Sequence, residues 1–317
     1  MRSLENILLL QIVKHSDNYL YQIERYRVIE RAELYLVLRN KVMSYTKLVI
    51  DGHVHYYNCY DPERFFDAAI TNLEISFRSN NSKEGNLQKI LLFTEGKEHN
   101  NFSRFKNNGI RGHNFGFENT KEGCSLILTK NSEPHCFILA GRQIVTQEKL
   151  EILSLASTHK IEDGLPAKEV VTTLLDRKEI TVLPWGVGKW FFKRGKTIKK
   201  IVKEYHSPYL FIGDNGARPS FWPTPKLYDI SKEFGVRVVS GSDPLPFSED
   251  TCRVGTFGFT IEGRVSVDKP AESFRNILLS NKGSITLFGN RDNARQFLRR
   301  QLKHRLNKFK LLQNLKP

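Results

Sequence analysis

Short apolar runs alternate with amphipathic segments over most of the chain. Continuous apolar runs bounded by turn residues are typical of buried strands, and apolar residues three or four positions apart are typical of helices. The predicted strands cover residues 47–55, 88–96, 149–157, 180–186, 209–215, 236–243 and 284–289. The predicted helices between them cover residues 61–78, 166–178, 196–205, 226–235 and 271–280.

This alternation predicts an α/β fold in which helices cover a parallel sheet. About seven or eight strands of this kind suit a closed barrel better than an open sheet, although an open sheet stays an alternative. We therefore expect a TIM-like β/α barrel, regular or distorted, over residues 47–290. Helical extensions are predicted to flank it, one over residues 1–46 and a basic one over residues 291–317.

Two stretches interrupt the alternation. Residues 97–122 are polar and rich in Asn and Gly, so we expect a long loop there. Residues 123–146 hold short apolar runs on either side of the turn sequence KNSEP, which is typical of an antiparallel hairpin. We interpret this second stretch as an antiparallel β insertion in the barrel.

Length and composition fit a globular protein. The 317 residues accommodate one barrel of about 250 residues with its extensions. Apolar residues make up 39% of the chain, which is enough to fill a core. The four cysteines lack the CxxC spacing of a cysteine zinc site. No apolar stretch reaches the roughly 18 residues of a membrane span, and no signal peptide is visible, so we expect a cytoplasmic protein with reduced thiols.

The net charge of +15 favours anionic partners, which include a small anionic substrate and nucleic acid. Part of the excess lies in residues 291–317, which carry nine Lys or Arg against one Asp. Nucleic acid binding through this basic C-terminal helix rests on charge alone, because no nucleic-acid-binding motif accompanies it. A solvated basic surface is the alternative interpretation.

Polar side chains follow several predicted strands at the point where each strand ends. In a parallel α/β sheet these carboxyl ends carry the functional site. The residues concerned are His53 and His55 after the first strand, Glu95 after the second, Asp214 and Asn215 after a middle strand, and Asp243 after a late strand. As a set they predict a site at this end of the fold.

His53 and His55 are the leading candidate metal ligands. Residues two apart on a strand point to the same face, so both imidazoles can bind one divalent cation. Asp243 can bind the same ion, take a proton from metal-bound water, or do both. The alternatives are two strand-terminal histidines bonded to loops and an Asp that caps a turn. We expect these residues to bind a divalent ion, with Zn²⁺ or Mn²⁺ favoured over Mg²⁺.

Glu95 and Asp214 are further candidate ligands, which would complete the coordination of the ion or bridge two ions. Asp214 lies in the turn sequence GDNGARP, so a structural role in the turn fits it equally well. Additional histidines, His99, His113 and His159, are candidates by their positions in the long loop or after a strand.

Four residues are expected to hold the substrate: Lys189, Arg218, Asn215 and Trp185. Arg218 can bind a phosphate or carboxylate with two hydrogen bonds. It can equally pair with a nearby Asp, and a buried Trp is more often part of a core.

The sequences IDGHVH and GSDPLPF together resemble the metal-dependent hydrolases with amidohydrolase-type barrels and the related PHP phosphoesterases. In those families an HxH motif on the first strand and an Asp on a late strand hold one to three divalent ions. The sequences LPWGVGKW, GDNGARP and AGRQIVT extend the resemblance, from about Lys47 to about Gln301, to a bacterial family in that superfamily. The resemblance implies a barrel, a hydrolase ancestry, and His53, His55 and Asp243 as metal ligands, with Asp243 also a candidate general base.

The sequence departs from the pattern of these families at defined places. The single histidines that amidohydrolase barrels carry after middle strands are replaced by Trp185-Gly186 and Asp214-Asn215. The histidine that PHP enzymes carry two residues after the late Asp is replaced by Leu245. We predict a metal-dependent hydrolase that acts on a small anionic phosphoester or amide. The alternative is a barrel that has lost catalysis and binds an anionic ligand or nucleic acid.

Overall fold

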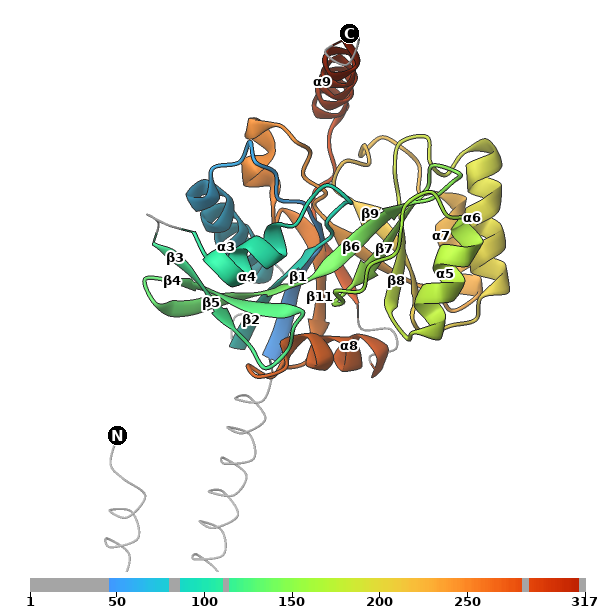
Figure 1. Cartoon of the computed structure of the whole chain (residues 1–317). Helices are drawn as coiled ribbons and strands as arrows, with labels where there is room; N and C mark the ends of the chain where they lie inside the picture. Colours follow the sequence, from blue (N-terminus) through green and yellow to red (C-terminus); the bar gives the residue numbers. More distant parts are fainter. Residues whose placement is uncertain (1–45, 80–85, 111–113, 281–284, 314–317) are drawn as a thin grey trace, which may run out of the picture. The chain divides into compact units, whose positions relative to one another are not determined.

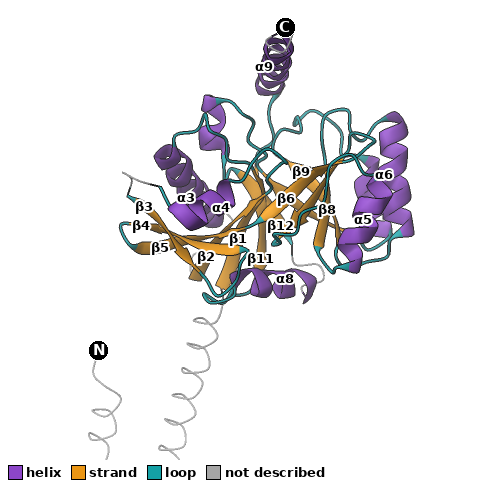
Figure 2. Cartoon of the chain, viewed as in Figure 1, coloured by secondary structure: helices purple, strands orange, loops and turns teal. Residues whose placement is uncertain are grey.

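The computed structural model describes residues 46–79, 86–110, 114–280 and 285–313. The helical extension predicted over residues 1–46 lies outside these ranges, except for Thr46, which begins the first strand. The described strands form two sheets, one of seven strands and one of five. Figure 2 shows these strands gathered at the centre with helices around them.

The larger sheet has the strand order β12-β11-β1-β2-β5-β4-β3. The strands β1 and β11 run antiparallel, as do the pairs β11–β12, β3–β4 and β4–β5, whereas β2 and β5 run parallel. The sheet is therefore mixed. Its strands are β1 (Thr46–Val54), β2 (Asn86–Phe93), β3 (Phe115–Asn119), β4 (Ser125–Lys130), β5 (Glu133–Leu139), β11 (Phe257–Glu262) and β12 (Thr286–Gly289).

The smaller sheet has the strand order β10-β9-β8-β7-β6. Its strands β8, β9 and β10 run parallel, whereas β6–β7 and β7–β8 are antiparallel pairs. Strands and helices alternate from β7 to β10, as expected, but only β8, β9 and β10 run parallel to one another. The strands are β6 (Gly141–Val145), β7 (Glu151–Leu155), β8 (Ile180–Pro184), β9 (Leu210–Asn215) and β10 (Arg237–Gly241), and the helices between them are α5 (Ala167–Asp176), α6 (Phe192–Glu204) and α7 (Lys226–Glu233).

The prediction of a TIM-like β/α barrel, regular or distorted, is wrong. The described strands divide between two sheets and do not close into one barrel. A TIM barrel needs eight parallel strands, whereas antiparallel pairs such as β1–β11 and β6–β7 break the parallel order here. Strand direction depends on the partner strand, which the apolar pattern of a single run does not reveal.

Three buried apolar clusters hold the layers together. The first lies between the larger sheet and helices α3 (Pro62–Ser79) and α4 (Asn101–Asn108), and it includes Phe66. The second lies between the two sheets and includes Phe274 of helix α8 (Pro270–Ser280). The third lies between the smaller sheet and helices α5, α6 and α7. Figure 1 accordingly shows α3 and α4 on one side of the strands and α5, α6 and α7 on the other.

The hairpin predicted in residues 123–146 is formed by β4 and β5, which pair antiparallel. The turn between them contains Asn131 and Ser132, both with positive φ. The hairpin is not an insertion in a barrel, because β5 also pairs with β2 and so belongs to the larger sheet.

The loop predicted over residues 97–122 contains helix α4 and strand β3, and β11 also lies outside the predicted strands. Helix α4 is short and mostly polar, so its sequence alone gives little helical signal. Phe102 and Phe105 on one of its faces are buried in the first cluster. Tertiary packing of this face, rather than intrinsic propensity, stabilises the helix.

Two glycines bring β1 of the larger sheet close to β10 of the smaller one. A Cβ atom at Gly52 would lie 2.6 Å from the carbonyl oxygen of Ser240, and one at Gly241 would lie 2.1 Å from the backbone nitrogen of His53. No side chain fits at these distances, so glycine is what permits the approach. The carboxyl ends of β1 and β10 consequently lie side by side.

Helix α9 (Ala294–Gln313) starts beside the sheets and extends away from them (Figure 1). Arg300 in this helix is 8% exposed and donates hydrogen bonds to Asp250 at 2.6 Å and Asp292 at 2.9 Å. A further hydrogen bond of 3.5 Å reaches the carbonyl oxygen of Asp243. The first turns of the basic helix are therefore anchored by a buried arginine. Within the described part of the chain, no helix combines the length and apolar character needed to cross a membrane.

Candidate metal centre

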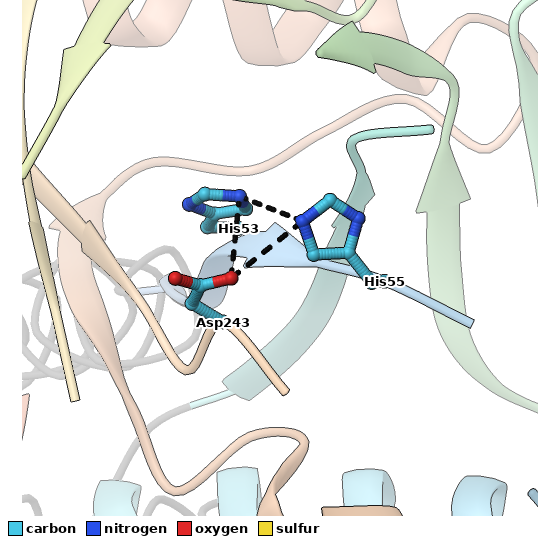
Figure 3. A group of neighbouring side chains, drawn as sticks. All are labelled: His53, His55 and Asp243. Atoms are coloured by element: carbon cyan, nitrogen blue, oxygen red, sulfur yellow. Dashed lines mark hydrogen bonds and ion pairs between the residues drawn. The ribbon is translucent and has the colours of Figure 1, made fainter. Parts of the chain in front are cut away.

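His53 and His55 follow one another on the same face at the end of β1 (Figure 3). Their Nε2 atoms are 3.0 Å apart, and the residues are 3% and 7% exposed. Alternation along an extended strand accounts for the shared face, since residues two apart point the same way. The two imidazoles thus present nitrogen atoms to one common point.

Asp243 completes this group from the end of β10 (Figure 3). Its Oδ1 atom lies 3.6 Å from the Nε2 atom of each histidine. The backbone N–H of Asp243 donates a hydrogen bond of 2.9 Å to the carbonyl oxygen of His53, which holds the carboxylate beside β1. All three ligand atoms lie within 4.8 Å of one another, and no other described residues form such a group.

Asp51 fixes the backbone on both sides of the group. Its carboxylate accepts hydrogen bonds from the backbone N–H groups of His53, Ser242 and Gly255, at 3.2, 2.8 and 2.7 Å. The hydroxyl group of Ser242 donates a fourth, at 2.5 Å. Burial raises the pKa of Asp51 to about 6, although these hydrogen bonds act in the opposite direction. Asp51 therefore ties the end of β1 to the segment that carries Asp243.

The three side chains fit a divalent ion. Zinc binds imidazole nitrogen and carboxylate oxygen at about 2.0–2.2 Å, which separates two ligands of a tetrahedral ion by about 3.3 Å. The observed separations between the ligand atoms, 3.0, 3.6 and 3.6 Å, lie on both sides of this value. Three protein ligands with a further position left for water are also the arrangement of catalytic zinc sites.

The protonation states of the group suit a cation. Burial, followed by the nearby His53, lowers the pKa of His55 to about 3, although Asp243 acts in the opposite direction. Burial raises the pKa of Asp243, but its electrostatic interactions with His53, His55, Lys189 and Arg300 outweigh burial and hold this pKa below its usual value. At neutral pH His55 is therefore neutral and Asp243 is charged, as metal ligation requires.

Two amide side chains contact the group. Asn215 donates hydrogen bonds to Oδ2 of Asp243 at 2.8 Å and to the carbonyl oxygen of Trp185 at 2.9 Å. Asn215, which we expected to bind substrate, thus orients Asp243 so that Oδ1 faces the histidines. The Oε1 atom of Gln143 lies 3.3 Å from Nε2 of His53. Sequence reasoning did not single out Gln143, since a lone Gln carries no chemical signal before its neighbours are known.

Glu95 lies outside the three-residue group. It is 6% exposed and accepts a hydrogen bond of 2.9 Å from the backbone N–H of Phe102, in the first turn of α4. The free N–H groups of a helix N-terminus stabilise a carboxylate at this position. Burial raises the pKa of Glu95, and the hydrogen bond from Phe102 opposes this effect.

Asp214 and Arg218 pair with each other. The guanidinium of Arg218 donates two hydrogen bonds of 2.8 Å, one to each carboxylate oxygen of Asp214. Both residues are 4% exposed. Of the interpretations considered for Arg218, pairing with a nearby Asp is the one that the structure shows. The carboxylate of Asp214 is used in this pair and is not in the candidate metal group.

Lys189 and Trp185 lie near the group from the β8 side. Lys189 forms an ion pair with Glu151 and is close enough for its charge to lower the pKa of Asp243. Trp185 is 3% exposed, and its carbonyl oxygen accepts the hydrogen bond from Asn215.

The remaining candidate histidines lie outside the group. His159 is bonded through Nδ1 to Oε1 of Glu179 at 2.5 Å. The ring of His99 packs against that of Tyr57, whose ring in turn lies 5.7 Å from that of His55. His113 is not among the described residues.

No protein-family model matches the chain, and no curated protein matches its sequence. Among solved structures it is similar to PsfC from Pseudomonas syringae PB-5123, with a TM-score of 0.49 and 13% sequence identity over 84% of this chain and 99% of PsfC. It is also similar to the lesion-specific endonuclease PfuEndoQ from Pyrococcus furiosus, with a TM-score of 0.44 and 12% identity over 76% of this chain.

A third similar structure is endonuclease Q in complex with a 27-mer duplex substrate that has an abasic lesion at the active site, with a TM-score of 0.41 and 11% identity. The chain spans 57% of the length of each endonuclease Q structure. These TM-scores and identities are too low to carry an argument about the function of this chain.

Proposed function

We propose that this chain is a metal-dependent hydrolase whose divalent ion is held by His53, His55 and Asp243. The observation that supports the proposal is the convergence of two imidazole nitrogens and one carboxylate oxygen within 4.8 Å. The ion would be Zn²⁺ or Mn²⁺. When bound, it would lower the pKa of a water molecule and polarise an oxygen of the substrate.

The residues of the chain would orient the reactants and handle the proton. Asp243 is our candidate for the group that takes a proton from the attacking water, because its side chain is 20% exposed whereas those of the two histidines are 4% and 8% exposed. Asn215 would keep this carboxylate in its orientation through the hydrogen bond to Oδ2. A lowered pKa keeps Asp243 ionised, which is the form that binds a cation and that a proton acceptor requires, although the same shift makes the carboxylate a weaker base.

The substrate that we propose is a small anionic phosphoester or amide. Lys189 is the partly exposed cation whose charge acts on Asp243, so it would attract an anionic group towards the site. Lys189 also pairs with Glu151, but that pair is partly exposed, whereas the pair of Arg218 with Asp214 is buried, so Arg218 is left out of this role.

Metal content and metal titration test the proposal. Purified protein is stripped with a chelator and titrated with Zn²⁺ and with Mn²⁺ by calorimetry. We expect about one equivalent of one of these ions to bind, and we expect the double variant His53→Ala/His55→Ala to lose that binding. His159→Ala is the matched control, because His159 is a histidine that lies outside the group. Equal binding by wild type and the double variant would reject the metal site.

Hydrolysis is tested next with p-nitrophenyl phosphate and p-nitroacetanilide as generic phosphoester and amide substrates. Activity that requires the added ion and falls by about 100-fold or more in Asp243→Asn is the expected result. Metal binding without hydrolysis of either substrate class would favour a protein that binds an anionic ligand without catalysis.

A further inference from the structure

All three tryptophans of the chain line one cleft. Trp185 follows β8, Trp190 precedes α6, and Trp222 lies before α7, so distant segments bring the three rings together. The cleft has a volume of about 430 Å³. This volume lies within the range of about 300–1,000 Å³ that is typical of small-molecule sites.

The aromatic walls of the cleft are held in place before any ligand arrives. The ring of Trp222 lies 6.4 Å from that of Trp185 and 5.7 Å from that of Phe191, which also lines the cleft. The Nε1 atom of Trp190 donates a hydrogen bond of 3.1 Å to the carbonyl oxygen of Pro184, which fixes its ring. Phe191 is 39% exposed and Trp222 is partly exposed, so aromatic surface remains accessible. Rings held in this way bind a planar ligand at a low cost in ordering.

Two exposed lysines line the same cleft. Lys199 lies on α6, and Lys226 is the first residue of α7. Neither lysine has an ion pair with a carboxylate of the described residues, whereas Lys200, beside Lys199, pairs with Glu204 at 3.6 Å. Two unpaired cations at the edge of an aromatic cleft complement a ligand that is planar at one end and anionic at the other.

We propose that this cleft binds a nucleotide, with its base stacked against Trp222 and its phosphate beside Lys199 and Lys226. Stacking of a base on an aromatic side chain contributes about 1–3 kcal/mol, and it tolerates any base because every base has a π-face. The ammonium groups of the two lysines add charge attraction to the phosphate.

The cleft is connected to the candidate metal centre through one residue. Asn215 donates hydrogen bonds both to the carbonyl oxygen of Trp185 and to Oδ2 of Asp243. Nucleotide binding nevertheless uses none of the proposed metal ligands. The proposed nucleotide site is therefore distinct from the proposed hydrolase site, and nucleotide binding does not depend on hydrolase activity.

The test is a titration of metal-free wild-type protein with AMP in a chelating buffer, followed by tryptophan fluorescence. Because every tryptophan of the chain lines the cleft, all of the tryptophan fluorescence comes from residues at the proposed site. We expect saturable quenching with a Kd below about 1 mM. Adenosine, which lacks the phosphate, should bind about tenfold more weakly, and ribose 5-phosphate, which lacks the base, should cause no comparable quenching.

Calorimetric titration of variants locates the site. Trp222→Leu and the double variant Lys199→Ala/Lys226→Ala should each raise the Kd for AMP by about tenfold. Lys196→Ala is the matched control, because Lys196 is an exposed lysine of the same helix that does not line the cleft. Absence of saturable AMP binding by wild type, an unchanged Kd in both cleft variants, or equal binding of ribose 5-phosphate and AMP would overturn the inference. Failure of the wild-type protein to bind Zn²⁺ or Mn²⁺ would reject the metal site but not the nucleotide site.

Discussion

Asp51 and Ser242 are joined by two hydrogen bonds, one from the backbone N–H and one from the hydroxyl group of Ser242. The first residue precedes the two candidate histidine ligands, and the second precedes Asp243. This connection holds together two segments that are far apart in the sequence. The candidate metal centre therefore depends on a residue that contributes no ligand.

Substitution of this carboxylate is expected to weaken both the fold and metal binding. In Asp51→Asn the amide group faces N–H donors and leaves one of them unpaired, which costs about 1–3 kcal/mol in the free energy of unfolding. Metal affinity should fall by about 10–100-fold, since residues that orient ligands have effects of this size. Chemical denaturation and calorimetric metal titration measure the two quantities. Asp61→Asn is the control, because Asp61 is exposed and its carboxylate accepts one hydrogen bond, from the backbone N–H of Arg64, which an amide oxygen can also accept.

The close approach of β1 and β10 predicts that Gly241 tolerates no side chain. In Gly241→Ala the new methyl group would lie 2.1 Å from the backbone nitrogen and 2.5 Å from Cβ of His53, so the strands must separate. We expect a loss of about 1–3 kcal/mol or more in the free energy of unfolding, together with loss of metal binding. Gly123→Ala, where the added atom meets nothing within 4 Å, should leave both unchanged. Equal stability of the two variants would contradict the close approach.

The low pKa of His55 predicts a pH dependence of stability in the metal-free protein. Burial lowers this pKa from 6.5 to about 3, so the unfolded chain takes up a proton at higher pH than the folded one. The contribution of a neutral His55 to stability is complete above about pH 6.5 and is lost as the pH falls towards 3.

The measurement compares the free energy of unfolding of wild type with that of His55→Gln, between about pH 7.5 and pH 5 in a chelating buffer. Below about pH 6.5, wild type should lose on the order of 1.4 kcal/mol per pH unit more than the variant. A difference between the two proteins that stays constant with pH would show that His55 titrates normally.

Neighbouring arginines of α9 should differ in their importance. Arg300 is buried and bonded to Asp250 and Asp292, so Arg300→Ala leaves two buried carboxylates without this partner. A loss of about 3–5 kcal/mol in the free energy of unfolding is expected. Arg299→Ala, at an exposed position of the same helix, should change it by less than about 0.5 kcal/mol. Similar effects of the two substitutions, measured by chemical denaturation, would show that α9 is not anchored through Arg300.

Much of the local structure follows from the sequence. The apolar runs that contain β1, β8 and β9 are buried strands, and the segments predicted as α3, α5 and α7 are helices. These elements have strong periodicity over several residues. Helix α4 was missed because most of its residues are polar, and β3 was missed because its five residues follow a stretch rich in Asn and Gly that predicts a loop. The packing of side chains such as Phe105 and Phe115 in the first cluster stabilises these short elements.

The direction and the order of the strands in the two sheets could be determined only from the tertiary structure. The run that forms β7 looks like a parallel strand, yet β7 pairs antiparallel with both β6 and β8. Pairing direction is decided by which strands meet across the sheet, and a strand's own apolar pattern is compatible with either direction. The expected barrel failed for this reason.

By itself the sequence determined that His53 and His55 share a face, because alternation along a strand is a local property of the backbone. It also indicated that carboxylates follow other strands, but it did not show which of them is free to bind an ion. Tertiary contacts decided that point: Asp243 is brought beside the histidines, whereas Asp214 pairs with Arg218 and Glu95 accepts the N–H of Phe102. A side chain's partner depends on residues that are distant in sequence, and only the folded chain places them within reach.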